Sequence, residues 1–375
     1  MASNFDPSVI STGLAFMPAW LPFAPPLGIT AVAAYLKKSE INVSVFDYNG
    51  KIWKQHQDFG HYWKMDYGGS WSHVKSYRER IHPVIVQSLV SAAHEMINSG
   101  VKSLGFSVYS SNYLPTRFTI KLIRLLRPDI KIYVGGASID KKLAEQDLKE
   151  HLIDAAIFGE GEDSCLRLLK YWEGQISIDE LKSTLIYNDQ GELFTAERNN
   201  LVKLNSLPIP DYSYVNFEHY YGRTLPLEFG RGCVANCSFC SETNYWVSFR
   251  VKSIDQIIAE MKNHIEKYQI NEFRVVDSLM NGNYKFLEQL IDRIIDEKLN
   301  VKWYGFCRID KRLTPELLAK MRKAGCTSIA FGLESGSQKI LNLMNKRVQI
   351  YDSYEVVTAA HNAGINVCAE ILMGF

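Results

Sequence analysis

Predicted strands and helices alternate along most of this chain, and that alternation constrains its fold more than any other feature. In the first half, apolar runs typical of buried strands occur at residues 9–17, 42–46, 103–108, 131–134 and 155–158. Apolar residues at helical spacing follow the strands, as at Ile29, Val32 and Leu36 after the first. Because strands joined by helices pair in parallel and carry helices on both faces, we expect an α/β fold. Residues 1–175 are predicted to form a doubly wound, Rossmann-like parallel sheet.

Two segments interrupt this alternation. Residues 48–100 are rich in aromatic side chains and end in a helix near residues 83–98. They form either an inserted subdomain whose aromatic residues are its own core, or a lid over a ligand. Residues 176–221 contain a predicted hairpin at 184–194, followed by a proline-containing stretch. Because prolines resist both helix and sheet, we interpret 176–221 as a hairpin and linker between two domains.

The second half, residues 222–375, repeats a strand, loop and helix unit. Strands are predicted at residues 225–229, 272–276, 301–306, 327–331 and 365–373. Consecutive parallel units of this kind form a partial TIM-type barrel, whose active site lies at the carboxyl ends of the strands. The chain stops directly after the last of these strands, so we expect the barrel to be incomplete at its C-terminus.

Composition excludes some classes of partner and compartment. The length of 375 residues favours two domains, and 46% hydrophobic residues suffice to bury a core in each. The net charge is +1 and no long basic block occurs, so we do not expect nucleic acid as a partner. Prolines break the apolar stretch at 13–26, which is therefore neither a signal peptide nor a membrane span.

Cysteine usage indicates a reducing compartment, and we expect a cytoplasmic protein. The chain has 7 cysteines, an odd number. Cys165, Cys307, Cys326 and Cys368 stand singly in apolar contexts. The last three lie on predicted strands, where a free cysteine behaves as a small core hydrophobe.

The other three, Cys233, Cys237 and Cys240, follow the strand at 225–229 on one short loop. Three thiolates this close in sequence converge on one metal centre, yet a closed zinc site and a ferredoxin-like cluster each need a fourth ligand. The nearest histidine, His219, lies on the other side of the preceding strand. Three cysteines on a four-iron cluster instead leave one iron open to substrate. A non-catalytic zinc-binding scaffold remains the alternative.

This loop resembles the signature of the radical SAM enzymes, Cys-x3-Cys-x2-Cys after the first barrel strand with an aromatic residue before the last cysteine. Here the aromatic residue is Phe239. The resemblance implies a 4Fe-4S cluster whose open iron is chelated by the amino and carboxylate groups of S-adenosylmethionine. It further implies that the reduced cluster cleaves this molecule to methionine and a deoxyadenosyl radical.

The resemblance also implies roles for four residues around S-adenosylmethionine. The backbone of Phe239 would meet the adenine edge, and Asp277 stands where many members have a Gly-Gly-Glu stretch that receives the methionyl amine. This sequence lacks those glycines. Glu334 would accept hydrogen bonds from the ribose hydroxyls, and Arg308 would pair with the methionyl carboxylate.

The first half resembles the cobalamin-binding domain that precedes the barrel in one large radical SAM subgroup. Residues in four loops at the carboxyl ends of the strands carry the match: Gly28; Tyr109, Ser110, Ser111 and Asn112; Gly135 and Gly136; Gly159, Glu160 and Gly161. No Asp-x-His-x-x-Gly sequence occurs, so no histidine ligand to cobalt is identified. The resemblance implies that the lower face of cobalamin lies against residues 109–112. A domain that has lost cobalamin binding is the alternative.

Together the two resemblances imply a cobalamin-dependent methyltransferase acting on an unactivated carbon. A radical rearrangement or cyclisation without methyl transfer is the alternative within enzymes. The expected partners are a small-molecule or peptide substrate and an electron donor such as flavodoxin or ferredoxin. The sequence does not identify the substrate.

Overall fold

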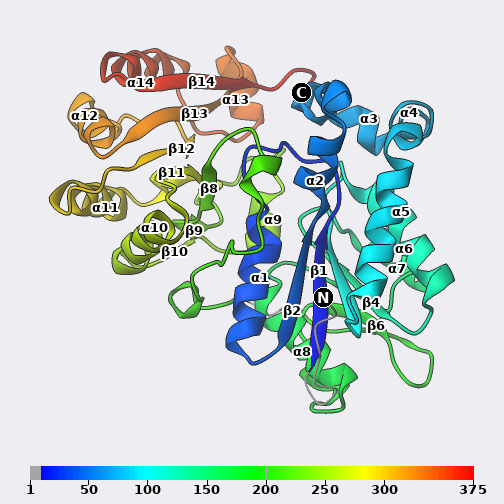
Figure 1. Cartoon of the computed structure of the whole chain (residues 1–375). Helices are drawn as coiled ribbons and strands as arrows, with labels where there is room; N and C mark the ends of the chain where they lie inside the picture. Colours follow the sequence, from blue (N-terminus) through cyan, green and yellow to red (C-terminus); the bar gives the residue numbers. More distant parts are fainter. Residues whose placement is uncertain (1–9, 199–200) are drawn as a thin grey trace. The chain divides into compact units, whose positions relative to one another are not determined.

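The structure is a computed structural model that describes residues 10–198 and 201–375 (Figure 1). It contains two compact units, which divide between Gly222 and Arg223. We call them unit 1 and unit 2 and describe each by itself. Val9, the predicted start of the first strand, lies outside the described residues. Within the described ranges, no helix has both the length and the apolar character needed to cross a membrane.

Unit 1 is built on a sheet with the strand order β2-β1-β3-β4-β5-β6-β7. The strands are β1 (Ser11–Phe16), β2 (Asn42–Asp47), β3 (Ser103–Ser107), β4 (Lys131–Gly135), β5 (Ala155–Ile157), β6 (Thr184–Tyr187) and β7 (Leu193–Thr195). The first five pair in parallel, as predicted. The predicted hairpin is present as β6 and β7, and it extends the sheet because β6 pairs antiparallel with β5.

Helices cover both faces of this sheet. They are α1 (Leu27–Lys38), α2 (Tyr48–Gln55), α5 (His82–Asn98), α6 (Tyr113–Leu126), α7 (Lys141–Lys149) and α8 (Glu162–Trp172). Because successive strand residues point to opposite faces, β1 contributes to two cores. Leu14 and Phe16 pack with apolar residues of α1 and α8, whereas Ala15 packs with those of α5 and α6. Figure 1 shows α1 and α5 on opposite sides of the sheet.

The aromatic insertion consists of short helical turns ahead of α5. They are η1 (Gln57–Trp63), η2 (Met65–Tyr67), α3 (Gly68–Ser72), α4 (Val74–Ser76) and η3 (Tyr77–Ile81). Trp63 and Trp71 are buried, and their rings meet edge to face with centroids 4.8 Å apart. Their indole nitrogens donate hydrogen bonds to Asn49 Oδ1 and to the Tyr62 carbonyl. Trp63 and Trp71 belong to the same buried cluster as Ala15 and Leu104 of the sheet, so these aromatic side chains pack as part of the core of unit 1.

Unit 2 is built on a parallel sheet with the strand order β14-β13-β12-β11-β8. The strands are β8 (Thr224–Leu227), β11 (Glu272–Val275), β12 (Lys302–Cys307), β13 (Cys326–Glu334) and β14 (Asn366–Ile371). The helices are α10 (Ile254–Tyr268), α11 (Tyr284–Asp296), α12 (Pro315–Lys323), α13 (Gln338–Leu343) and α14 (Ile350–Asn362). Side chains at two helix starts accept backbone N–H groups, Ser253 from Gln256 and Thr314 from Leu317. The repeated parallel unit confirms the predicted class.

Two sequence predictions in unit 2 were wrong. The strand predicted at 225–229 ends at Leu227, and a separate antiparallel ribbon follows, formed by β9 (Gly230–Arg231) and β10 (Arg250–Val251). Gly232 then turns the chain with φ +84, where a Cβ atom would lie 2.4 Å from the Ser248 carbonyl oxygen. Cys307 and Cys326 are buried as predicted, but Cys368 is exposed because β14 has few neighbours over it.

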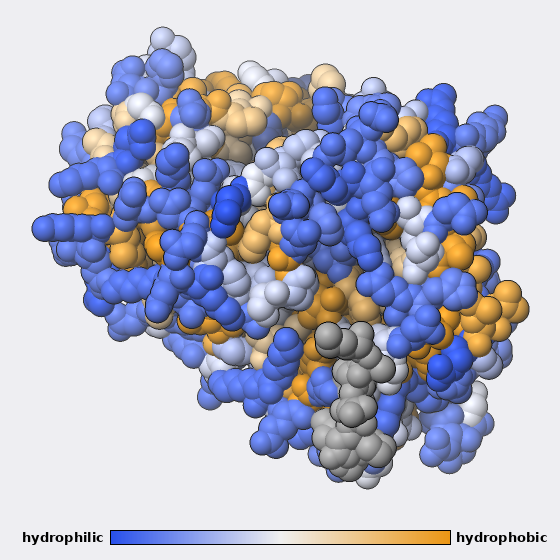
Figure 2. Space-filling model, viewed as in Figure 1, coloured by the Kyte–Doolittle hydropathy of each residue, from blue (hydrophilic) through white to orange (hydrophobic). Residues whose placement is uncertain are grey.

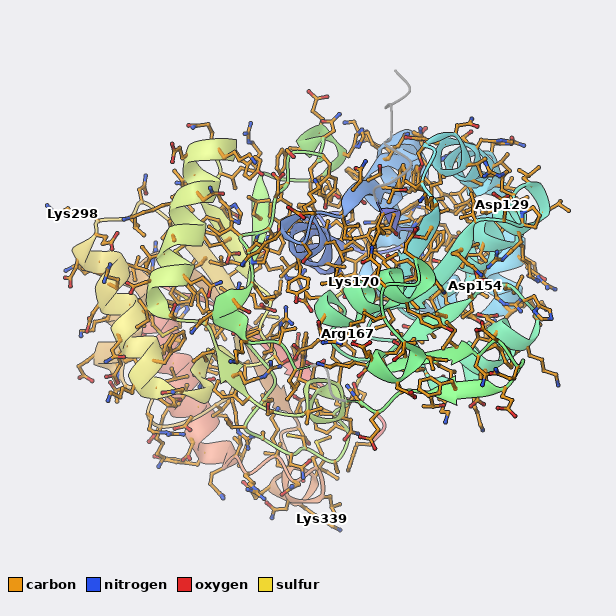
Figure 3. The ribbon with its side chains drawn as sticks, turned by 90° about the horizontal axis from the view of Figure 1, so that it is seen from below. Asp129, Asp154, Arg167, Lys170, Lys298 and Lys339 are labelled. Atoms are coloured by element: carbon orange, nitrogen blue, oxygen red, sulfur yellow. The ribbon has the colours of Figure 1, made fainter. Side chains whose placement is uncertain are left out.

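Polar side chains dominate the outside of the chain. Hydrophilic residues cover most of the face shown in Figure 2. The exposed charged residues Asp129, Lys298 and Lys339 project outward from their helices and turns in Figure 3. This distribution fits the nearly balanced net charge of +1.

Candidate functional site

The three clustered cysteines lie on a loop enclosed between β9 and β10, at the carboxyl end of β8. All three are free and half-buried, whereas Val234 and Phe239 between them are exposed. In the described part of the chain, no three Cys, His, Asp or Glu side chains are arranged closely enough to hold a metal ion. The three thiols therefore share one loop, but their sulfur atoms are not gathered around one point in this structure.

The groups around the loop both raise and lower the pKa of the Cys233 thiol. Burial raises the pKa of the Cys233 thiol, and the nearby Cys237 acts in the same direction. The Ala235 amide, which donates to Cys233 Sγ over 3.4 Å, and the cations of Arg308 and Lys346 lower that pKa. Positive charge beside a thiol favours the thiolate, which is the form that binds metal.

Both ends of the loop are fixed by carboxylates. Before the loop, the Phe229 amide donates to Asp277 Oδ1 over 2.8 Å. After it, Glu242 on α9 (Glu242–Trp246) accepts hydrogen bonds from the Trp246 indole, over 2.9 Å, and from the Ser278 hydroxyl. Since Asp277 and Ser278 directly follow β11, the neighbouring strand holds both ends of the cysteine loop.

A network of buried charges underlies the same region. Arg231 pairs with Glu228 over 2.8 Å, and Lys252 pairs with Glu260 over 2.9 Å and with Glu228 over 3.7 Å. All four side chains are buried, and the most exposed of them, Glu228, exposes 8% of its side-chain surface. Buried ion pairs contribute little net stability, but they are costly to break and so fix the backbone around them.

Asp277 lies beside this network of buried charges. It is 4% exposed and its carboxylate is used by the backbone at Phe229. Burial, together with the Glu228 carboxylate, raises the pKa of Asp277 well above its usual value. The sequence-based role for Asp277 stays a prediction, while in the structure its carboxyl group holds the Phe229 amide.

The other three predicted residues around S-adenosylmethionine are placed near the loop by contacts and charge. Glu334 ends β13 with φ 64, and its Oε1 accepts a hydrogen bond from Lys346 Nζ over 2.7 Å. That ammonium group also lies 5.8 Å from the centre of the Phe239 ring. Arg308 follows β12. Its backbone N–H donates to Asn281 Oδ1, and its carbonyl accepts from Asn281 Nδ2.

Lys346 was missed by the sequence reasoning. It is 8% exposed, it pairs with Glu334, and it lies close enough to Cys233 to affect the pKa of that thiol. Its place in the turn after α13 carries no motif. Only the fold brings this lysine to the cysteine loop, so the sequence alone gave no signal for it.

In unit 1, the four predicted cobalamin loops all lie at the carboxyl ends of parallel strands. Several of their residues prove to be structural. Asn112 is buried, and its amide accepts from the Tyr109 N–H over 2.7 Å and donates to the carbonyls of Met17 and Ser107. Ser111 donates to the Ala19 carbonyl over 2.6 Å. The 109–112 loop is thereby fastened to the segment after β1.

Tyr109 and Ser110 differ from these anchors. The Tyr109 ring packs on Trp20 with centroids 4.7 Å apart, and 40% of Trp20 is exposed. Ser110 is also exposed. This edge of the sheet therefore presents an aromatic surface beside a hydroxyl group, which suits a flat and partly apolar ligand.

The glycine residues of these loops also fall into two groups, those that packing requires and those that it does not. Gly136 has φ +114, and a Cβ atom there would lie 2.6 Å from the Val108 carbonyl oxygen, so packing requires glycine. A Cβ atom at Gly161 would lie 3.2 Å from Val32. At Gly28 and Gly135 the nearest atoms are 4.0 and 3.5 Å away, which leaves room for a ligand.

Gly159 and Glu160 form the remaining loop. Gly159 has φ +72, in the left-handed region that favours glycine. Glu160 is 3% exposed, and its Oε2 accepts the Val202 N–H over 3.0 Å. The Glu160 carboxylate therefore orders the segment near residue 202.

Comparisons with known proteins agree with this arrangement. Residues 227–375 match the family model of the radical SAM superfamily. The chain is 28% identical over 269 residues to an anaerobic magnesium-protoporphyrin IX monomethyl ester cyclase of Cereibacter sphaeroides, covering 68% of this chain and 44% of that protein. It is 23% identical over 395 residues to the cytidylyl-2-hydroxyethylphosphonate methyltransferase of Streptomyces wedmorensis, covering 93% of this chain and 68% of that protein.

A solved structure extends the likeness to both units. The cobalamin-dependent S-adenosylmethionine radical enzyme OxsB, determined with aqua-cobalamin bound, superposes with a TM-score of 0.74 at 16% identity. The match covers 98% of this chain and 50% of OxsB. Residues 227–375 thus match the radical SAM superfamily, and the chain has a fold similar to that of the cobalamin-dependent radical SAM enzyme OxsB.

Proposed function

We propose that this chain belongs to an enzyme that carries a 4Fe-4S cluster on Cys233, Cys237 and Cys240 and cleaves S-adenosylmethionine reductively. The observation that carries the proposal is the Cys-x3-Cys-x2-Cys loop at the carboxyl end of β8 in a matched radical SAM domain. When bound, such a cluster supplies the electron that splits S-adenosylmethionine into methionine and a deoxyadenosyl radical. Three thiolate ligands suit this role because they leave one iron open.

Residues around the loop fit the rest of S-adenosylmethionine. Arg308 and Lys346 offer positive charge to the methionyl carboxylate beside Cys233. Glu334 stands at the carboxyl end of β13, where barrels of this type bind ligands, and its carboxylate can accept hydrogen bonds from ribose hydroxyls. Phe239 exposes 38% of its surface, and its backbone is free on that side to meet the adenine edge.

We further propose that unit 1 binds cobalamin and that the enzyme methylates an unactivated carbon. Cobalamin would supply the methyl group. The space at Gly28, the exposed Ser110 and the Trp20–Tyr109 aromatic pair lie at the carboxyl edge of the sheet and suit a corrin ring. Ser111 and Asn112 hold this edge in place by donating hydrogen bonds to the carbonyls of Ala19 and Met17. The methyltransferase name of the Streptomyces relative supports the choice of reaction.

Anaerobic reconstitution tests both parts. Wild-type protein is expected to bind iron and sulfide, to bind added cobalamin, and to release deoxyadenosine from S-adenosylmethionine with a chemical reductant. Methyl-labelled S-adenosylmethionine is expected to transfer its label to product. Replacing Cys237 by Ala should abolish iron uptake, whereas replacing the buried Cys326 should not. Zinc in place of iron, with no deoxyadenosine released, would contradict the proposal and favour a scaffold.

A radical cyclisation is the second candidate. It is favoured by the Cereibacter relative, whose name is that of a cyclase. This reaction consumes S-adenosylmethionine and releases deoxyadenosine, but transfers no methyl label to product. The same labelling experiment therefore separates the two reactions.

The remaining partners follow from the chemistry proposed. The enzyme needs a one-electron donor such as flavodoxin or ferredoxin and a small-molecule or peptide substrate. We place it in the cytoplasm, because its cysteines are free and an iron-sulfur site requires reducing conditions. Release of deoxyadenosine with reduced flavodoxin replacing the chemical reductant tests the donor.

A further inference from the structure

The middle of the cysteine loop is held by the turn after α13. One of these contacts joins two residues that lie 109 positions apart in the sequence. The Ser238 amide donates to the Met344 carbonyl over 2.9 Å, and the Ser238 hydroxyl donates to the Leu343 carbonyl over 3.3 Å. Asn345 Nδ2 donates to the Asn236 carbonyl over 2.7 Å. The bond to Asn236 is the one that reaches between the first two cysteines.

Asn345 is well fixed for this contact. Its φ of 51 lies in the left-handed region, which asparagine tolerates better than most residues. Its neighbours Met344 and Lys346 are 0% and 8% exposed, so the turn is anchored on both sides. Arg347 Nε donates to Asn345 Oδ1 over 3.2 Å, which occupies the acceptor end of the amide and leaves its NH₂ end for the Asn236 carbonyl.

We propose that Asn345 is a positioning residue, which through the Asn236 carbonyl holds the loop segment between Cys233 and Cys237 in place for cluster binding. The inference rests on the proposed function. The loop ends are fixed by Asp277 and Glu242, but those contacts lie outside the cysteine segment. The Asn345 hydrogen bond therefore restrains the part of the loop that the end contacts do not reach.

Two substitutions at this position separate hydrogen bonding from shape. Asn345→Asp keeps the size and tolerates the same φ, but it places an oxygen against the Asn236 carbonyl oxygen while keeping the contact with Arg347. Asn345→Gly keeps the φ but deletes both the donor to the Asn236 carbonyl and the acceptor of the Arg347 hydrogen bond. The matched control is Asn342→Ala on α13, because the Asn342 side chain accepts a hydrogen bond from Gln338 over 2.9 Å within the helix.

The first measurement is the rate at which a chelator removes iron from anaerobically reconstituted protein. Loss of one net hydrogen bond predicts release roughly fivefold faster in Asn345→Gly, and the added repulsion predicts more than roughly tenfold in Asn345→Asp. Asn342→Ala should match the wild type. Thermal unfolding of the apo proteins checks that every variant folds.

The second measurement needs no cluster. Amide hydrogen exchange of residues 234–239 in the apo protein should be several-fold faster in Asn345→Asp than in the wild type and in Asn342→Ala. Wild-type iron retention and wild-type exchange in a folded Asn345→Asp variant would overturn the inference and leave the proposed function standing. Failure of the wild type itself to take up iron would overturn the proposed function, and the cluster-positioning role with it.

Discussion

Replacing Asp277 by Asn tests whether this carboxyl group is structural or binds ligand. The side chain is 4% exposed and accepts the Phe229 N–H over 2.8 Å, a hydrogen bond that an amide oxygen accepts equally well. Burial and the neighbouring Glu228 carboxylate raise the pKa of Asp277 well above its usual value. The neutral isostere should therefore replace the native group without loss of the β8–β9 backbone.

The sign of the pH dependence follows from that shift. Between the unfolded pKa near 4 and the raised folded pKa, the folded chain keeps a proton that the unfolded chain releases, so the stability contributed by Asp277 falls as pH rises. Each unit of separation corresponds to about 1.4 kcal/mol. Because an amide does not titrate, Asp277→Asn should match the wild type near pH 4.5 and become increasingly more stable than the wild type as the pH rises toward 8.

Urea unfolding of the apo protein across this pH range measures the difference, and S-adenosylmethionine affinity of the reconstituted protein is the second readout. The matched control is Glu334→Gln, at the proposed ribose contact. The control should weaken S-adenosylmethionine binding, whereas Asp277→Asn should not. Weaker binding in Asp277→Asn, with a stability difference that does not change with pH, would refute the structural role and restore the ligand role.

Four further substitutions test the fold. Gly136→Ala should destabilise the protein by at least about 2 kcal/mol in urea unfolding, because φ is +114 and the Val108 carbonyl blocks a Cβ atom, whereas Gly28→Ala should be neutral. Lys252→Met should cost about 3–5 kcal/mol, since the buried Glu260 loses its ammonium partner and Glu228 keeps only Arg231. Trp71→Ala should cost about 3–5 kcal/mol by leaving a cavity in the insertion core, and a wild-type melting temperature would contradict that packing.

Local patterns made most of the architecture predictable. Buried strands and amphipathic helices differ in period, and caps such as Ser253 and Thr314 mark helix starts from within three residues. The cysteine spacing is equally local, so the loop and its place after β8 followed from sequence. Features that depend on a few consecutive residues can therefore be predicted from the sequence alone.

Long-range pairing was the part that could not be predicted. The β9–β10 ribbon joins residues twenty positions apart through only two residues on each strand, too few to show a period. Asp277 was assigned a ligand role because it stands where many radical SAM enzymes have a Gly-Gly-Glu stretch, and nothing local in the sequence indicated its hydrogen bond to the Phe229 backbone. Lys346 and Asn345 reach the loop from a turn without a motif. Each of these depends on which strands become neighbours.

The charges around the cysteine loop also explain why Arg308 is the residue best suited to an incoming anion. Beneath the loop, Glu228 and Glu260 are balanced by Arg231 and Lys252. The raised pKa of Asp277 keeps a further negative charge from forming there. Lys346 is already paired with Glu334, whereas Arg308 forms no salt bridge within the described part of the chain. We therefore predict that a methionyl carboxylate bound beside Cys233 pairs with the Arg308 guanidinium, which also lowers the pKa of the nearby Asp310.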